Sequence, residues 1–485
     1  MNFKFVLRII SHILLVEVAL MAPSLFISLF LHERSAKAFL MTMGINVIIA
    51  IILYVYTRNA KKGRFYAREG LVTTSLTWIL MSLLGALPFY FSGFIPNYVD
   101  AFFETVSGFT TTGSSILLDI ESLDKGLLFW RSFTHWIGGM GVLVFLMSIV
   151  SLGNKNQGFS LHILRAESPG PTVGKMVPRM KKTAEILYIL YFALTFFNVV
   201  FLVIGGMSLF EACCTAFGTA GTGGFGIKND SLTSYSPYIQ YVTTVFMLLF
   251  SINFSIYYIL ILKKFKEAFK DEEFKLFWFI VISSILIITI NVHKLYPTLS
   301  ETFRNVAFSV ASIISTTGYG IADFNLWPSL SKSILVILML LGACAGSTGG
   351  GLKQIRLLLL IKSLRKNLHK SLHPSEVKAV IVNGKAMDDD TLQTTNAYLI
   401  AYVFIIVLSF LIISLDGFSF ETNLTAIIAT FNNIGPGLDM VGPTGNYAAF
   451  SNMSKLVMCA DMLAGRLEIY PMLILLSKTT WKRAR

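Results

Sequence analysis

The sequence predicts an all-α polytopic membrane protein, with four pseudo-symmetric helix–pore-loop–helix units around a central pore and two extra N-terminal transmembrane helices. The composition excludes an ordinary soluble globule, because 54% of the 485 residues are hydrophobic and only 14% are charged. Many apolar runs approach the ~20 residues that a helix needs to cross a bilayer. A stretch rich in glycine and threonine also recurs, each time after an apolar segment too short to cross.

The chain divides, in order, into leading helices, four similar units and a tail. Residues 1–69 hold the two leading transmembrane helices. The units occupy residues 70–153, 183–263, 274–365 and 394–478, and residues 479–485 form a basic tail. We expect the spans at 239–262 and 452–477 to be continuous, whereas the span at about 330–361 contains a glycine-rich interruption.

The distribution of charge predicts the orientation of the spans. The net charge of +13 comes largely from basic loops between spans, which the positive-inside bias places in the cytoplasm. This location argues for a membrane surface and against nucleic acid. The charged residues of the segment 94–128 are five acidic residues and one lysine, so this segment should face outside. We therefore expect a multi-pass protein of the cell (inner) membrane with both termini cytoplasmic.

The four recurring stretches have similar surroundings. They are Phe109 to Ser115, Thr219 to Phe225, Ser315 to Gly320, and Asn432 to Leu438. In each unit a polar residue near the start of the short helix precedes a loop glycine by thirteen positions. These pairs are Asp100 and Gly113, Glu211 and Gly224, Asn305 and Gly318, and Thr422 and Gly435. Such an internal repeat predicts quasi-symmetry, with a site on the shared axis.

The loop chemistry suits a dehydrated cation. Non-helical backbone at membrane depth persists only where protein or a water-filled cavity satisfies it, and rings of carbonyl oxygens can replace the hydration shell of potassium. The C-terminal end of each short helix carries a negative partial charge that favours a cation. The competing interpretation is that Gly, Ser and Thr simply allow close helix packing. Four loops in register favour the cation site.

Two further features fall inside expected spans. Gly342 to Leu352 reads GACAGSTGGGL, and each glycine costs a helix about 1 kcal/mol relative to alanine. The helix should therefore break in mid-membrane, either as a flexible gate or as a fixed kink. Arg466 is costly at membrane depth and should face a cavity or a partner. It is interpreted either as an electrostatic barrier below the loops or as half of a buried ion pair.

At these residues the chain resembles the Trk/Ktr/HKT superfamily of potassium transporters, most closely its TrkH type, over essentially its whole length. The resemblance rests on short motifs spread along the sequence. They are Thr111-Thr112-Gly113, Gly223-Gly224-Phe225, Thr316-Thr317-Gly318, Asn433-Ile434-Gly435, Gly346 to Gly351 with Lys353 and Arg356, Gly465 to Ile469, Trp136 to Gly141, and Arg165-Ala166-Glu167 with Pro169-Gly170-Pro171.

The resemblance implies potassium uptake through a filter of backbone carbonyls, and no enzymatic activity. The implied potassium ligands are the carbonyls of Thr111, Thr112, Thr222, Gly223, Thr316, Thr317, Asn433 and Ile434. The implied filter glycines are Gly113, Gly224, Gly318 and Gly435. The implied gating residues are Gly346, Ser347, Thr348, Gly349, Gly350, Gly351 and Arg466.

The resemblance also implies a homodimer and a cytoplasmic ring of TrkA-like nucleotide-binding regulatory subunits. The chain shows no Rossmann pattern, so we expect it to bind no nucleotide itself. The main alternative is a less selective monovalent cation symporter coupled to sodium or protons. An intramembrane enzyme would need a catalytic constellation, and none is visible in the sequence. A scaffold for a cytoplasmic complex would show no ion flux.

Overall fold

The described part of the chain is mostly helical. A computed structural model describes residues 3–58, 67–139, 141, 180–376 and 378–481. Six described helices are long and apolar enough to cross a membrane, or seven if one bent pair counts as a single span. The expected all-α polytopic fold is confirmed. The end of the predicted first unit, residues 142–153, and the motif at 165–171 lie outside the described residues.

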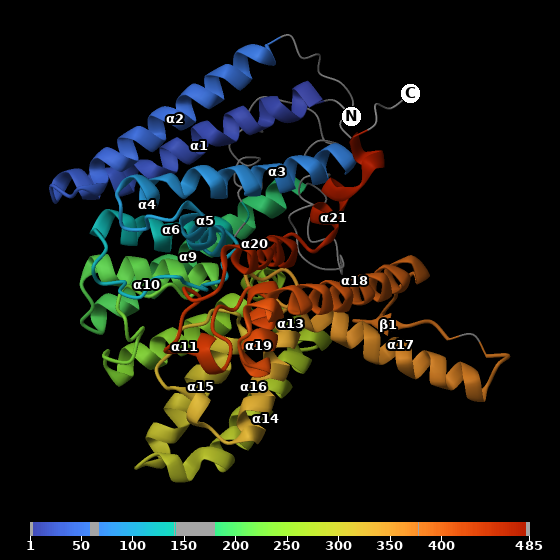
Figure 1. The fold of residues 1–485 in the computed structure, drawn as a ribbon. Coiled ribbons are helices and arrows are strands. Elements are labelled where there is room, and N and C mark those ends of the chain that lie inside the picture. Colours follow the sequence, from blue (N-terminus) through green and yellow to red (C-terminus); the bar gives the residue numbers. More distant parts are fainter. Residues whose placement is uncertain (1–2, 59–66, 140, 142–179, 377, 482–485) are drawn as a thin grey trace.

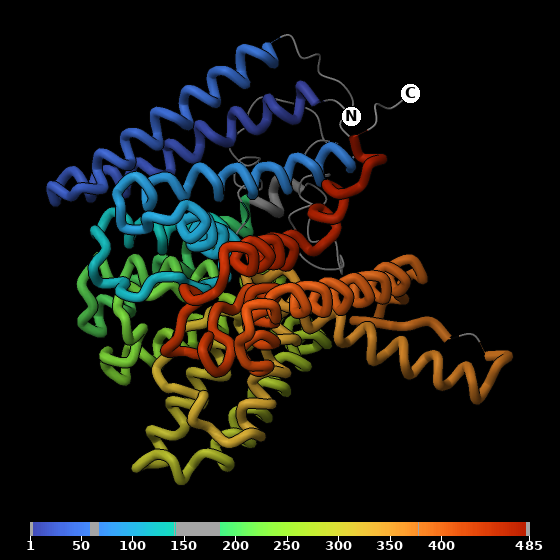
Figure 2. Tube along the Cα trace, in the orientation of Figure 1, coloured from blue at the N-terminus to red at the C-terminus, as the bar shows by residue number. Residues whose placement is uncertain are grey.

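The two leading helices form an antiparallel hairpin along one edge of the molecule (Figure 2). They are α1 (Phe3–Phe30) and α2 (Ser35–Tyr56). A 2.9 Å hydrogen bond between the hydroxyls of Ser28 and Ser35 joins them near the turn. α1 also packs against α3 and α6 of the first unit, so the hairpin is attached to the side of the four-unit body.

Each unit places a short helix between longer elements (Figure 1). The first has α3 (Ala67–Gly85), α4 (Leu87–Phe91), α5 (Tyr98–Phe109) and α6 (Lys125–Gly139). The second has α9 (Met180–Ile204), α10 (Leu209–Gly221), α11 (Pro237–Ser251) and α12 (Phe254–Ile261). The third has α14 (Glu272–Val292), α15 (Leu299–Ile314), α16 (Ser329–Leu341) and α17 (Gln354–Leu372). The fourth has α18 (Asp389–Ile413), α19 (Phe420–Phe431), α20 (Asn452–Arg466) and α21 (Tyr470–Leu476).

Minor elements connect the units. They are α13 (Phe265–Ala268), five 3-10 turns (His293–Leu295, Phe324–Leu326, Ser414–Asp416, Asp439–Val441 and Lys478–Trp481), and a small antiparallel hairpin of β1 (Ile381–Val382) with β2 (Lys385–Ala386). In the hairpin Ile381 pairs with Ala386 and Val382 with Lys385.

The short helices start and pack in the same way in all four units. Their N-caps are Asn97, Ser208, Thr298 and Ser419, and each cap side chain accepts a backbone N–H of the first turn. Each short helix then packs against the outgoing helix of the unit before it: α10 on α6, α15 on α11, and α19 on α16. α5 packs on α20 of the last unit. The four units therefore close into a ring.

Two spans that we expected to be continuous are broken. α11 and α12 meet at 92°, because Ile252 is extended and the side chain of Asn253 caps α12 by accepting the N–H of Ser255. α20 ends at Arg466, and Ile469 has a φ of 65° directly before α21. Pro471 in the first turn of α21 suits a helix start and not a helix interior. The predicted break between α16 and α17 is present.

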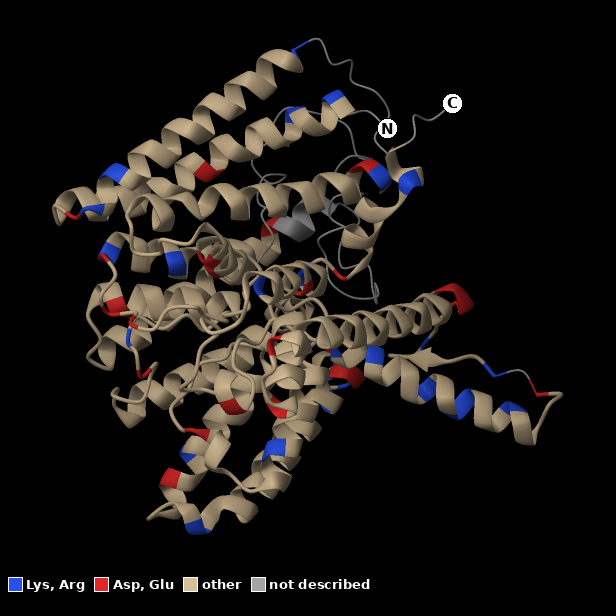
Figure 3. Cartoon of the chain, in the orientation of Figure 1, with Lys and Arg blue, Asp and Glu red and all other residues tan. Residues whose placement is uncertain are grey.

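Charge is distributed unevenly over the fold. Figure 3 shows Lys and Arg spaced along α17, which protrudes from the body, whereas the long apolar helices carry few charges. The basic residues of the outer part of α17 are Lys362, Arg365, Lys366 and Lys370. The leucines Leu364, Leu368 and Leu372 on this helix are 60%, 58% and 77% exposed. The outer part of α17 thus presents basic and apolar groups away from the four-unit body.

Candidate functional site

All four short helices end in the same backbone turn. The residue that leaves each helix has a positive φ, and so does the glycine two positions later. The first residues are Thr111, Thr222, Thr316 and Asn433, with φ of 56°, 56°, 60° and 55°. The glycines are Gly113, Gly224, Gly318 and Gly435, with φ of 86°, 73°, 84° and 97°. The four loops are thus equivalent residue by residue.

Matching hydrogen bonds hold the four turns. In each turn the residue after the left-handed one donates its N–H to a carbonyl five positions earlier. These bonds are Thr112 to Ser107 (2.9 Å), Gly223 to Gly218 (2.8 Å), Thr317 to Ser312 (2.9 Å) and Ile434 to Ala429 (2.9 Å). This is the Schellman pattern, which usually has glycine at the left-handed position. Threonine is strained there, and retained strain of this kind is common at functional sites.

The glycines bring the four loops into contact. A Cβ on Gly113 would lie 1.9 Å from the carbonyl oxygen of Gly223. The corresponding distances are 1.9 Å from Gly224 to Thr317, 2.1 Å from Gly318 to Ile434 and 2.8 Å from Gly435 to Thr112. Each glycine therefore lies beside a carbonyl of the next loop, and the fourth loop returns to the first. A side chain at any of the four positions would collide with that carbonyl.

Hydroxyl groups support the same backbone. Thr112 and Thr110 share a 2.8 Å hydrogen bond between their hydroxyls, and Thr317 and Ser315 share the equivalent bond at 2.7 Å. In the fourth unit the hydroxyl of Tyr447 donates to the carbonyl of Gly435 at 2.7 Å. These hydroxyls bond to other protein groups, so the ring itself is formed by the loop backbone.

The glycine-rich stretch between α16 and α17 lies against the ends of two short helices. The N–H of Gly350 donates to the hydroxyl of Thr316 at 2.7 Å, and the hydroxyl of Thr348 donates to the carbonyl of Phe250 at 3.1 Å. A Cβ on Gly350 would lie 2.3 Å from the carbonyl oxygen of Asn432. The intramembrane loop, residues 342–353, therefore touches the third and fourth units next to their filter stretches. All six predicted gating residues from 346 to 351 belong to it.

Arg466 joins this loop to the first unit. Its guanidinium donates to the carbonyl of Thr348 at 2.7 Å, and to the carbonyls of Gly138 and Gly139 at 2.5 and 2.7 Å. The two glycines end α6, where exposed carbonyls and the negative end of the helix dipole favour a cation. Arg466 therefore links backbone oxygens of the intramembrane loop to those at the end of α6.

The whole chain matches one protein family. The sequence profile of the TrkH family, described as a cation transport protein, matches residues 36–482. The chain belongs to the TrkH family. It is 32% identical to the "Trk system potassium uptake protein TrkH" of Salmonella typhimurium and of Escherichia coli K12, over 99% of this chain and 100% of each relative. These TrkH relatives are named as transport proteins and not as enzymes.

A solved TrkH structure has the same fold. The crystal structure of the potassium transporter TrkH from Vibrio parahaemolyticus superposes with a TM-score of 0.88 at 29% identity. The match covers 99% of this chain and 100% of that one. TrkG of Escherichia coli K12, also named as a potassium uptake protein, is 31% identical over 95% of both chains. The fold of this TrkH-family chain therefore agrees with that crystal structure over nearly its whole length.

A buried ion pair, which the sequence alone does not indicate, lies behind the first two loops. Arg131 of α6 donates to the carboxylate of Glu104 of α5 at 2.6 Å, and both side chains are at most 2% exposed. The same carboxylate accepts the N–H of Ile116 at 3.0 Å, and Arg131 also donates to the carbonyl of Gly226 at 2.8 Å. The pair therefore ties the chain after the first loop of this TrkH-family protein to the chain after the second.

His135 makes a second connection between these loops. Its Nδ1 lies 2.8 Å from the carbonyl of Gly108, and its Nε2 accepts the N–H of Phe225 at 3.3 Å. Nδ1 therefore carries the proton and the ring is neutral. A Cβ on Gly223 would lie 2.3 Å from this ring. His135 thus explains why the second loop of this TrkH-family chain carries two consecutive glycines.

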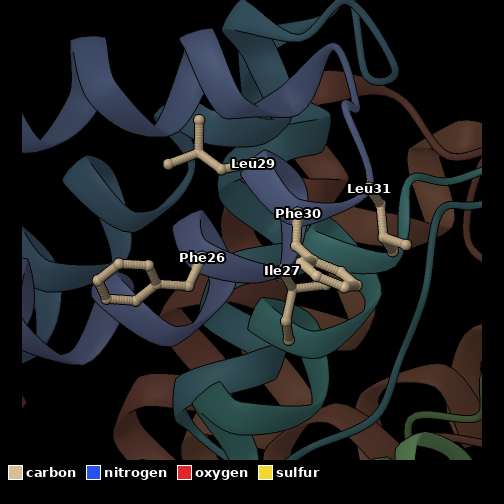
Figure 4. A pocket seen from close by; sticks show the side chains of 5 residues that line it. All are labelled: Phe26, Ile27, Leu29, Phe30 and Leu31. Atoms are coloured by element: carbon tan, nitrogen blue, oxygen red, sulfur yellow. The ribbon is translucent and has the colours of Figure 1, made fainter.

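A hollow at the end of α1 is unrelated to the loops. It is lined by Phe26, Ile27, Leu29, Phe30 and Leu31 (Figure 4). Their side chains are apolar and supply no ligand for a cation. A surface of this kind suits contact with lipid chains.

Proposed function

We propose that this chain takes up potassium ions across the cytoplasmic membrane through the ring of loop carbonyls. The observation that carries the proposal is the closed contact of each loop glycine with a carbonyl of the next loop. Four equivalent backbone segments around one axis can replace water around a monovalent cation. The names of the relatives, which are potassium uptake proteins, support potassium as that cation.

The proposed ligands are the carbonyls of the two residues before each ring glycine. They are Thr111, Thr112, Thr222, Gly223, Thr316, Thr317, Asn433 and Ile434. The helix ends behind them favour positive charge. Inward flux runs down the membrane potential, which contributes about 2.3 kcal/mol per charge for each 100 mV.

The proposed gate is the intramembrane loop together with Arg466. The loop contacts the ends of α15 and α19, and Arg466 binds its carbonyl at Thr348. A positive charge held next to the route of a cation raises the barrier to its passage. Movement of the loop away from the ring, with displacement of Arg466, would open the route.

We also propose a homodimer that is regulated by a cytoplasmic ring of nucleotide-binding subunits. The basic and leucine-bearing outer part of α17 supports contact with such a ring. The relatives are named as parts of a Trk system. The nucleotide would bind to those partner subunits and not to this chain.

Flux through the purified protein in liposomes tests the proposal. We expect uptake of potassium and rubidium under an inside-negative potential, little uptake of sodium, and no dependence on a sodium or proton gradient. Flux that requires either gradient would establish the coupled symporter instead. Absence of any cation flux, with the partner ring present or absent, would reject the proposed function.

A further inference from the structure

Glu273 is not part of the intramembrane loop but hydrogen-bonds to the backbone on both sides of its glycine-rich segment. It lies in the first turn of α14 and is 5% exposed. Its Oε1 accepts the N–H of Ala345 at 2.7 Å and the N–H of Ile355 at 3.0 Å. Ala345 precedes the stretch from Gly346 to Gly351, and Ile355 follows it. A single carboxylate oxygen therefore binds the backbone both before and after the glycine-rich segment.

The bond to Ile355 also caps α17. Ile355 is the second residue of this helix, so its N–H belongs to the first turn and has no partner within the helix. Lys353, at the N-cap position, does not cap the helix with its side chain, which donates to the carbonyl of Gly349 instead. Glu273 satisfies the donor from a different helix. The start of α17 and the loop before it are thus fixed to α14.

Several hydrogen bonds hold the loop, including those of Arg466 to the carbonyl of Thr348 and of Lys353 to the carbonyl of Gly349. Between α16 and α17 the chain has positive φ at Gly342, Gly346 and Gly351, and glycine backbone is intrinsically free to change conformation. The two bonds to Glu273 fix the backbone on both sides of this segment.

We propose that Glu273 is a positioning residue that holds the intramembrane loop in its place below the filter ring. The inference rests on the proposed gating function and assigns the regulation of that gate to a side chain of α14. Glu273 acts through the amides of Ala345 and Ile355 and does not touch the ion. Weakening its bonds favours the displaced position of the loop, so ion flux increases.

The preceding residue provides a matched control. Glu272 lies in the same turn of α14, but its carboxylate binds Lys362 of α17 and accepts the N–H of Asn383 at 2.9 Å. Its contacts thus lie on the outer part of α17 and on the β-hairpin. Glu272→Gln removes a charge one position away from Glu273 and leaves the amides of Ala345 and Ile355 bonded.

Hydrogen exchange of the folded protein tests the restraint directly. In Glu273→Gln we expect amide exchange of peptides within residues 342–356 to rise about tenfold, which corresponds to about 1.4 kcal/mol, with unchanged exchange in α15 and α19. Glu272→Gln should match the wild type across the loop. Unchanged exchange in the loop of Glu273→Gln, or a rise spread evenly over all helices, would overturn the inference. If Glu273→Gln fails to fold, Glu273→Asp shortens the reach and keeps the charge, and the same local rise is expected.

Potassium flux in liposomes distinguishes a failure of this inference from a failure of the proposed gate. We expect Glu273→Gln to raise flux severalfold and Glu272→Gln to leave it unchanged. If Arg466→Ala raises flux and Glu273→Gln does not, the role of Glu273 is rejected and the gate stands. If neither variant raises flux although wild-type protein conducts, the proposed gate is rejected together with the inference.

Discussion

The side-chain amide of Asn433 donates a 3.0 Å hydrogen bond to the hydroxyl of Thr112, joining the fourth loop to the first across 321 residues of sequence. This junction is the widest of the four, since the Cβ position of Gly435 lies 2.8 Å from the carbonyl of Thr112, against 1.9 to 2.1 Å elsewhere. The hydroxyl of Ser114 also reaches the carbonyl of Gly435, at 3.3 Å. Side chains therefore reinforce the ring where its backbone contact is loosest.

The ring geometry predicts that Gly318→Ala abolishes discrimination between potassium and sodium. The added methyl group would lie 2.1 Å from the carbonyl oxygen of Ile434, at a φ of 84° that an alanine adopts at a cost. The carbonyl must move, and the ligand cage changes. Competition of potassium and sodium with rubidium uptake in liposomes measures the effect.

Gly320→Ala is the control for this variant. It lies two residues away, and the nearest atom to its Cβ position is 3.5 Å distant, an ordinary contact. We expect wild-type selectivity for Gly320→Ala. Wild-type discrimination in folded Gly318→Ala would contradict a carbonyl cage at this position.

The buried pair of Arg131 and Glu104 predicts a large loss of stability in Glu104→Gln. Removing one partner leaves an uncompensated charge at a site that is at most 2% exposed, which typically costs about 3–5 kcal/mol. Thermal unfolding in detergent, at matched protein concentration, reports the change.

The exposed pair of Lys332 and Glu421, at 3.3 Å, provides the comparison, because Glu421→Gln should cost less than about 1 kcal/mol. Equal losses in the two variants would argue against a structural role for the buried pair.

The start of each filter loop could be predicted because the signal is local. A polar residue followed thirteen positions later by a glycine, with an apolar run between them too short to cross, identifies α5, α10 and α19 closely. α15 begins at Leu299, earlier than the spacing from Gly318 indicates, because Thr298 caps it one turn sooner. The expected break after Leu341 is also local, since glycines cannot sustain a helix.

Contacts between distant residues could not be predicted in the same way. Glu104 and Arg131 meet where α5 packs on α6 within the first unit, whereas Asn433 and Thr112 become neighbours only when the four units close into a ring. The repeat predicts the ring but not which side chains bond within it. The bend at Asn253 and the break before Pro471 did have local signals. Each sits in an apolar run long enough to span a bilayer, so the length of the run predicts one continuous span, whereas the cap and the proline indicate a break.

Arg466→Ala should increase potassium flux by about tenfold, which corresponds to about 1.4 kcal/mol removed from the barrier. The guanidinium binds the carbonyl of Thr348 in the intramembrane loop and those of Gly138 and Gly139 at the end of α6. Its loss removes a positive charge from the proposed route and releases the loop from the first unit. Initial rates of rubidium uptake in liposomes, normalised to the amount of folded protein, measure the change.

Arg466→Lys distinguishes charge from anchoring. Lysine keeps the positive charge but is a point donor, so it cannot reproduce the planar fork that reaches carbonyls on two elements. We expect flux between the wild type and Arg466→Ala, because the electrostatic barrier persists while the link between α6 and the loop weakens. Flux at or below the wild-type level in well-folded Arg466→Ala would show that Arg466 stabilises the structure without limiting conduction. If Arg466→Lys conducts as fast as Arg466→Ala, the link between α6 and the loop, and not the charge, limits the flux.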